Sequence, residues 1–229
     1  MIKKLVTLFA IGRKLALSDA MHIISKIYEI PLIIKIFFSL IGLFGKKDFN
    51  QSQNEEERLC KSMESMGITF IKLGQFLATR PDIIGEKLST QLQTLQDKVP
   101  AFSKEIAIKE IKEGIGNENY KDFINISEPV AAASIAQVHK AQIKEDGILK
   151  EVAIKVLRPN IKKVFNDEIE ALMLLAYIIE SLVKKTKRLK LVEVVFLLKE
   201  ITNHEMDLRF EAAAANEFAE NTKNDIGFY

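Results

Sequence analysis

The chain has 229 residues, 48% hydrophobic and 28% charged, which is enough apolar content for a packed core and argues against disorder. Its 33 basic and 31 acidic side chains leave a net charge of +2, so no nucleic acid partner is expected, because nucleic-acid-binding domains usually carry a clear basic excess. The single cysteine, Cys60, allows no intrachain disulfide, and no spacing of His and Cys is typical of a metal site.

The first strongly apolar segment is residues 30–44, IPLIIKIFFSLIGLF, which Lys35 interrupts. It is shorter than the roughly 20 residues that a membrane-spanning helix needs. It therefore predicts either a helix at a membrane surface or re-entering it, or a helix buried against the rest of the domain, and the sequence leaves these open.

Helical periodicity dominates the next hundred residues. Residues 46–57 are polar and are interpreted as a linker. After them, apolar residues spaced by four and three predict one amphipathic helix, which the Arg80-Pro81 pair ends. Its apolar positions are Leu59, Met63, Met66, Phe70, Leu73 and Leu77. Further apolar spacing predicts a helix over 84–95 and, after an N-cap at Ser103, a helix that closes near Gly114 and Gly116.

The period then changes to that of β-strands. Residues 129–143 and 151–158 are compatible with strands, and Asp146-Gly147 between them is a strong turn signal. In the second segment Val152, Ile154 and Val156 alternate with the residues between them, as expected for a strand with two different faces.

Two long helical patterns follow, separated by the basic cluster at residues 184–190, and the second is predicted to run from about Val192 to about Asn221. The order of helices, a small sheet and further helices indicates an α+β fold.

The strand lysine Lys155 is the first candidate for chemistry. A lysine on a strand is most often solvated. Here, however, an alanine-rich loop, a strand, a turn and a strand reading V-A-I-K give the layout of a kinase nucleotide site, in which the lysine contacts phosphates and pairs with a helical glutamate. The loop comprises Ala131, Ala132, Ala133 and Ser134. Taken alone, this loop is better explained as a close-packed turn.

Two further groups of polar residues lie on predicted helices. Lys72 and Gln75 share a helix face beside Gly74, and a helical glycine often marks the close approach of another segment. Glu205, Asp207 and Glu211 lie in the last predicted helix, with Asp207 and Glu211 on one face, so that one helix could offer one carboxylate to Lys155 and another to Lys72. By spacing alone, both groups would be taken as solvent-facing.

The ordered set of motifs is highly specific even though each motif is modest. The motifs are K-L-G-Q at residues 72–75, A-T-R-P-D at 78–82, A-A-A-S at 131–134, V-A-I-K-V-L-R-P at 152–159 and E-M-D-L-R-F-E-A at 205–212. In this order they strongly resemble the UbiB family of atypical kinase-like proteins, over roughly residues 55–229.

The resemblance implies roles for these residues. Lys155 resembles the nucleotide-contacting lysine, Glu211 its helix partner, and Glu205 and Asp207 the family's acidic motif. Residues 131–134 resemble the alanine-rich replacement of the glycine loop. Lys72 and Gln75 resemble the signature helix that folds over the nucleotide pocket.

The resemblance also implies three segments and a cofactor. The segments are N-terminal helices and a linker (1–54), a family-specific helical extension (55–127) and a kinase-like small lobe (128–229). ATP or ADP with Mg²⁺ is the implied cofactor, and the implied role is support of ubiquinone biosynthesis at the cytoplasmic side of an inner membrane. The expected partners are ubiquinone biosynthesis proteins and a membrane surface.

Phosphoryl transfer needs catalytic and metal-binding residues downstream of the small lobe, and the sequence ends before any of them could occur. The chain is therefore expected to be a truncated family member without the large lobe, incomplete as a catalyst unless that lobe is supplied in trans. The alternative is a non-enzymatic protein that acts at a membrane surface through residues 30–44 and 184–190.

Overall fold

The computed structural model describes residues 2–17, 32–42, 54–95, 99–145, 147–225 and 227 of the chain. The chain divides into two compact units, each built from two stretches of sequence. The helical unit comprises Met1–Val99 and Lys163–Lys199, and the sheet unit comprises Pro100–Lys162 and Glu200–Tyr229. The three-segment division expected from the resemblance stays a prediction.

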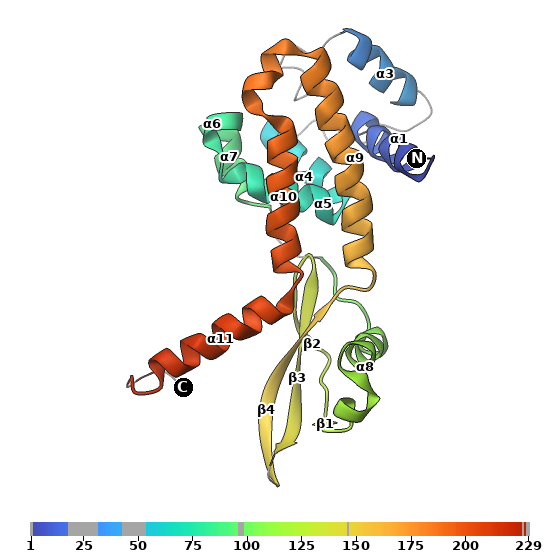
Figure 1. Ribbon diagram of the computed structural model, residues 1–229. Helices are drawn as coiled ribbons and strands as arrows, with labels where there is room; N and C mark the ends of the chain where they lie inside the picture. The colour runs from blue at the N-terminus through green and yellow to red at the C-terminus, as the bar shows by residue number, and fades with distance from the viewer. Residues whose placement is uncertain are drawn as a thin grey trace. The chain divides into compact units, whose positions relative to one another are not determined.

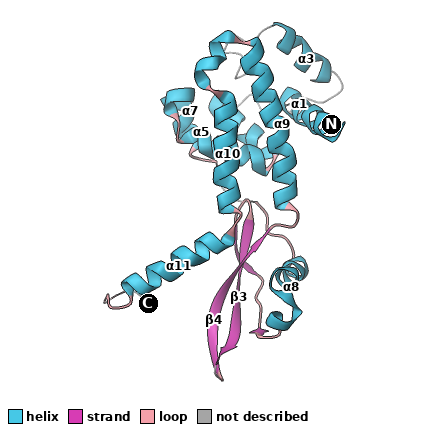
Figure 2. Cartoon of the chain, viewed as in Figure 1, coloured by secondary structure: helices cyan, strands magenta, loops and turns pink. Residues whose placement is uncertain are grey.

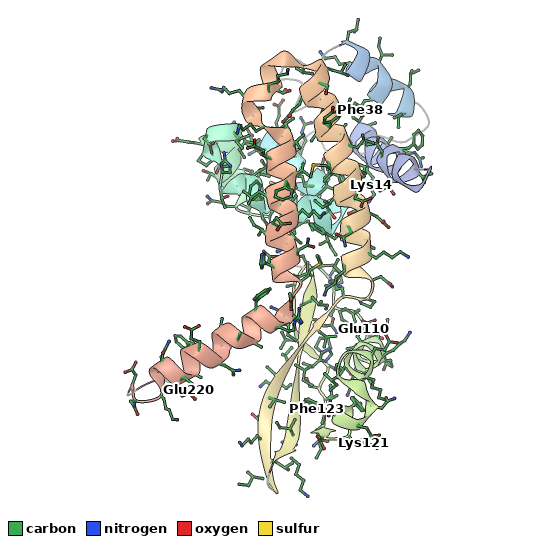
Figure 3. All side chains as sticks on the ribbon, viewed as in Figure 1. Lys14, Phe38, Glu110, Lys121, Phe123 and Glu220 are labelled. Carbon is green, nitrogen blue, oxygen red and sulfur yellow. The ribbon has the colours of Figure 1, made fainter. Side chains whose placement is uncertain are left out.

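Short helices and parts of two long ones make up the helical unit (Figure 1). Its helices are α1 (Ile2–Leu17), α3 (Leu32–Gly42), α4 (Glu55–Met66), α5 (Ile68–Ala78), α6 (Pro81–Ile84), α7 (Glu86–Leu92), most of α9 (Ile161–Leu182), η1 (Lys184–Leu189) and the first part of α10 (Leu191–Glu205). Its largest fully buried side chains come from α1, α5, α7, α9 and α10, among them Phe70, Leu92 and Phe165. Lys14 of α1, labelled in Figure 3, donates a hydrogen bond to the carbonyl of Met66 at 2.8 Å.

The single helix predicted from Leu59 to Leu77 is two helices, so that expectation was wrong. Gly67 lies between them with φ of 107°, a conformation that glycine adopts readily and other residues rarely do. The apolar spacing continues through this break, which is why periodicity did not reveal it. The predicted linker also ends earlier than expected, because Asn54 caps α4 by accepting a hydrogen bond from the Glu57 amide at 2.8 Å.

The sheet unit contains α8 (Lys104–Tyr120), a four-stranded antiparallel sheet and α11 (Leu208–Thr222), as Figure 2 shows by colour. The strands are β1 (Phe123–Ile124), β2 (Pro129–Ala132), β3 (Ala136–Glu145) and β4 (Ile148–Leu157). The β3–β4 pairing runs from Ala136–Leu157 to Glu145–Ile148, which confirms the predicted hairpin; Asp146 itself lies outside the described residues. The mixture of helices with this small sheet confirms the predicted α+β class.

One face of the sheet forms the core of this unit. Val156 and Ala141 are buried together with Ile111 of α8, and Val152 and Ile154 pack against them. Because neighbouring residues of a strand point to opposite faces, Lys155 lies on the other face. The predicted N-cap of α8 is confirmed, since the Ser103 hydroxyl accepts a hydrogen bond from the Ile106 amide.

The last predicted helix is also divided. Helix α10 ends at Glu205, and α11 begins at Leu208 after the N-cap residue Asp207. The expectation that one continuous helix carries Glu205 and Glu211 was therefore wrong, and the face assignment that rested on it does not hold. The cause is local: the Asp207 carboxylate accepts a hydrogen bond from the Arg209 amide, which starts a new helix at this point instead of extending α10.

Candidate functional site

The sheet unit brings two predicted site residues into direct contact. Lys155 Nζ of β4 lies 2.6 Å from Glu211 Oε2 in the first turn of α11. The two side chains are 37% and 60% exposed. A solvent-exposed ion pair of this kind contributes at most about 1 kcal/mol to folding, so a large role in stability is not its explanation. It does place the Lys155 ammonium next to a carboxylate on the open face of the sheet.

The alanine-rich loop joins β2 to β3. Ala131 and Ala132 end β2, and the chain then turns so that the Ala133 amide donates a hydrogen bond to the Ala136 carbonyl at 2.8 Å. Ser134 at the turn is fully buried, and its hydroxyl has no hydrogen-bond partner among the described residues. The four predicted loop residues thus have different environments, with Ala131 exposed and Ser134 enclosed.

Sequence reasoning missed Arg158 as a contributor to this loop. Its guanidinium donates to the Ala133 carbonyl through Nε at 3.2 Å and Nη2 at 2.8 Å. Its own amide donates to the Ile135 carbonyl at 2.9 Å. In the sequence Arg158 stands only as part of the V-A-I-K-V-L-R-P motif, which says nothing about which carbonyl the guanidinium reaches.

The residues of the acidic motif, Glu205 and Asp207, lie where α10 ends and α11 begins. Glu205 is exposed at the end of α10, and Asp207 caps α11. The Arg209 guanidinium hydrogen-bonds both oxygens of Asp207, with Nε 2.7 Å from Oδ1, and this contact lowers the pKa of Asp207 to about 2. Asp207 is therefore an ionised carboxylate held by a neighbouring arginine.

Lys72 and Gln75 lie on α5 in the helical unit. The Gln75 side-chain amide donates to the Leu95 carbonyl at 3.5 Å. Between the two residues, Gly74 is buried beside Leu95 and Met63. A side chain would not fit here, since a Cβ at this position would overlap Leu95 Cδ1 and lie 3.1 Å from Met63 Sδ. The glycine thus does mark a close approach of another segment, whereas the place of Lys72 and Gln75 over a nucleotide stays a prediction.

A small antiparallel sheet with a helix on its core face and a lysine–glutamate pair on its other face defines the class of kinase-like small lobes. The model of the ABC1 atypical kinase-like domain matches residues 94–229 of the chain. The chain belongs to this family of atypical kinase-like proteins, and the predicted resemblance to UbiB proteins is confirmed.

Several curated proteins are similar to this chain, and each is described as a probable protein kinase UbiB. The protein of Tolumonas auensis is 37% identical over 189 residues, which cover 82% of this chain and 34% of that protein. The protein of Pseudomonas aeruginosa strain PAO1 is 39% identical over 165 residues, 72% of this chain and 30% of its own length. The protein of Marinobacter nauticus is 36% identical over 204 residues, which cover 88% of this chain and 36% of that protein. The chain thus spans about a third of the length of these relatives.

Proposed function

We propose that the sheet unit is a nucleotide-binding lobe that takes ATP or ADP against the open face of β4. The observation that carries this proposal is the Lys155–Glu211 pair, at 2.6 Å. In this arrangement the Lys155 ammonium contacts the nucleotide phosphates, and the Glu211 carboxylate orients it. The alanine-rich loop at residues 131–134 would cover the phosphates from the adjoining edge.

The activity of a whole family member is a wider proposal. We infer that the chain acts within a UbiB-type ATPase or atypical protein kinase that supports ubiquinone biosynthesis, at the cytoplasmic side of an inner membrane. The description of the relatives as probable protein kinases supports the kinase part of this proposal, and the family resemblance implies the rest. Mg²⁺ would enter with the nucleotide and neutralise phosphate charge. Catalysis would require a large lobe in addition to the residues described here.

A titration of the purified chain with ADP and ATP, with and without Mg²⁺, tests the nucleotide proposal. A ligand that binds only the folded state stabilises it by RT ln(1 + [L]/Kd), so the unfolding temperature rises with the logarithm of the ligand concentration above Kd. We expect a rise with the native chain and a loss of most of that rise in Lys155→Ala.

Lys144→Ala is the matched control, because Lys144 is an exposed lysine on the paired strand β3, near the far end of the hairpin. The control should retain the full shift. No shift for the native chain at millimolar nucleotide, or equal shifts in both variants, would exclude the proposed site.

A second candidate function, attachment to a membrane surface, rests on α3. Leu32, Ile36 and Leu40 are 72%, 49% and 58% exposed, and their spacing of four places them along one side of the helix. Phe38, labelled in Figure 3, is buried instead. Among the described residues, no helix combines the length and the apolar character needed to cross a membrane. An exposed apolar stripe on a short helix fits the membrane interface rather than its interior.

Flotation with anionic vesicles tests this second candidate. We expect the native chain to float, Ile36→Glu with Leu40→Glu to remain in solution, and binding to weaken with salt if the basic cluster at residues 184–190 contributes. Val164→Glu is the control, because Val164 is a similarly exposed apolar residue on α9. Equal flotation of the α3 variant and the control would contradict the proposal.

A further inference from the structure

Arg158 connects two loops that are distant in the sequence. Besides its two hydrogen bonds to the Ala133 carbonyl, it donates through Nη1 to the Pro100 carbonyl at 2.9 Å. The guanidinium also lies over the Phe102 ring, 5.7 Å from its centroid. One side chain thus ties the alanine-rich loop to the segment that precedes α8.

The segment before α8 is itself fixed to the sheet by a buried polar network. The Gln137 side-chain amide bonds both backbone groups of Phe102, accepting from its N–H at 2.9 Å and donating to its carbonyl at 3.1 Å. The remaining amide proton of Gln137 faces His139 Nε2 at 2.9 Å. His139 Nδ1 lies 2.8 Å from the Ser127 carbonyl, which can only accept. His139 is therefore the Nδ1–H tautomer, and the network has a donor and an acceptor at each contact.

This network gives Arg158 a rigid support. Gln137 and His139 are 1% and 0% exposed, and a fully paired buried network of this kind specifies a single arrangement. With Phe102 fixed, the Pro100 carbonyl two residues earlier is held in place, and Arg158 spans from it to Ala133. Burial lowers the pKa of Arg158, as expected for a cation that is partly removed from water.

Both backbone groups of Ala133 are consequently engaged within the protein. Its N–H bonds the Ala136 carbonyl, and its carbonyl accepts from the Arg158 guanidinium. A glycine-rich loop can adopt many backbone conformations as it closes over phosphate. The alanine-rich loop has fewer conformations available, because alanine restricts the backbone and the bonds to Arg158 restrain it further.

We propose that Arg158 is a positioning residue for the nucleotide site, which holds the alanine-rich loop in its binding conformation without touching the ligand. The proposal rests on the proposed nucleotide function for its effect on affinity, but not for its effect on the loop. A lysine cannot replace this arginine, because the contact with two carbonyls uses the planar fork of the guanidinium.

Hydrogen–deuterium exchange of the nucleotide-free chain tests the loop directly. In Arg158→Lys we expect the amides of residues 133–136 to exchange about tenfold faster. The substitution removes the guanidinium hydrogen bonds to the Ala133 carbonyl, and a tenfold change corresponds to a loss of about 1.4 kcal/mol. Amides at the far end of the β3–β4 hairpin should be unchanged. Arg80→Lys is the matched control, since Arg80 also makes a two-bond contact, with Asp82 in the helical unit.

Nucleotide affinity and chemical rescue complete the test. We expect ADP affinity to fall about tenfold in Arg158→Lys and Arg158→Ala. Millimolar guanidinium should restore affinity and loop protection in Arg158→Ala, because the free ion can occupy the vacated site, whereas a general loss of stability would not respond to it. Unchanged loop exchange in Arg158→Lys, or Arg158→Ala without rescue, would overturn the proposal. If the native chain binds no ADP, the nucleotide function fails, and the exchange data still decide whether Arg158 holds the loop.

Discussion

Asp207 shows how one residue serves two local purposes. Its carboxylate caps α11 through the amide of Arg209 and also binds the guanidinium of the same residue. Both contacts favour the ionised form, which is why its pKa lies at about 2 instead of 3.8. The cap and the ion pair, both made by the Asp207 carboxylate with Arg209, fix where the first turn of α11 begins. Glu211 lies in that turn.

The first prediction concerns the titration of Asp207. Because its pKa is lower in the folded than in the unfolded chain, its stabilising effect is complete above pH 3.8 and declines as pH falls toward 2. In Arg209→Ala the midpoint of the carboxyl titration, followed by NMR, should rise toward 3.8. A midpoint that remains near 2 would mean that the cap alone sets the pKa.

Lys155 and Glu211 are the residues for which sequence interpretation was most informative. The V-A-I-K strand and the E-M-D-L-R-F-E-A segment indicated the pair, and the structure shows it as an ion pair. Arg158 could not be recognised in this way, because its role depends on Pro100 and Ala133, which lie 58 and 25 residues away in the chain.

At the scale of elements, helix periodicity located the helices but not their ends. The apolar spacing through Gly67 and the helix-forming residues around Met206 both continue across breaks. In each case one residue ends the helix: Gly67 through its positive φ, and Asp207 through its cap on the next helix. Neither changes the spacing of the apolar residues, so periodicity did not indicate the break.

The second prediction compares two helical glycines. Gly74→Ala should destabilise the chain by about 1–3 kcal/mol, because the new methyl group would overlap Leu95. Gly114→Ala in α8 meets nothing within 4 Å and should stabilise it by about 0.5–1 kcal/mol through higher helix propensity. Urea unfolding curves of both variants measure the difference. Equal effects would show that Leu95 moves aside without cost.

For the whole molecule, the division into two units separates the predicted site residues. Lys155, Glu211 and the alanine-rich loop belong to the sheet unit, whereas Lys72 and Gln75 belong to the helical unit. The sequence could indicate all of them, because motifs identify residues. It could not indicate this division, because each unit combines two separate stretches of the chain.

The third prediction asks whether both units respond to nucleotide. On addition of ADP we expect slower amide exchange at residues 131–136 and in the first turn of α11. If Lys72 and Gln75 cover the nucleotide, as the resemblance implies, α5 should also be protected. Lys155→Ala should abolish all of these changes. Protection confined to the sheet unit would assign Lys72 and Gln75 a role other than contact with nucleotide.

Helix α11 has 15 residues and buries none of them, and Phe210 and Phe218 are each 57% exposed. A helix of this length that buries none of its side chains gains little from packing, and by itself it is only marginally favoured over the coil in water. In the proposed nucleotide site, the fraction of molecules in which α11 is formed would set how often Glu211 is in place, and the apparent affinity for nucleotide would be scaled by that fraction. A protein surface that buried one side of this helix would raise that fraction, and in the proposed site it would raise the affinity for nucleotide without touching the ligand.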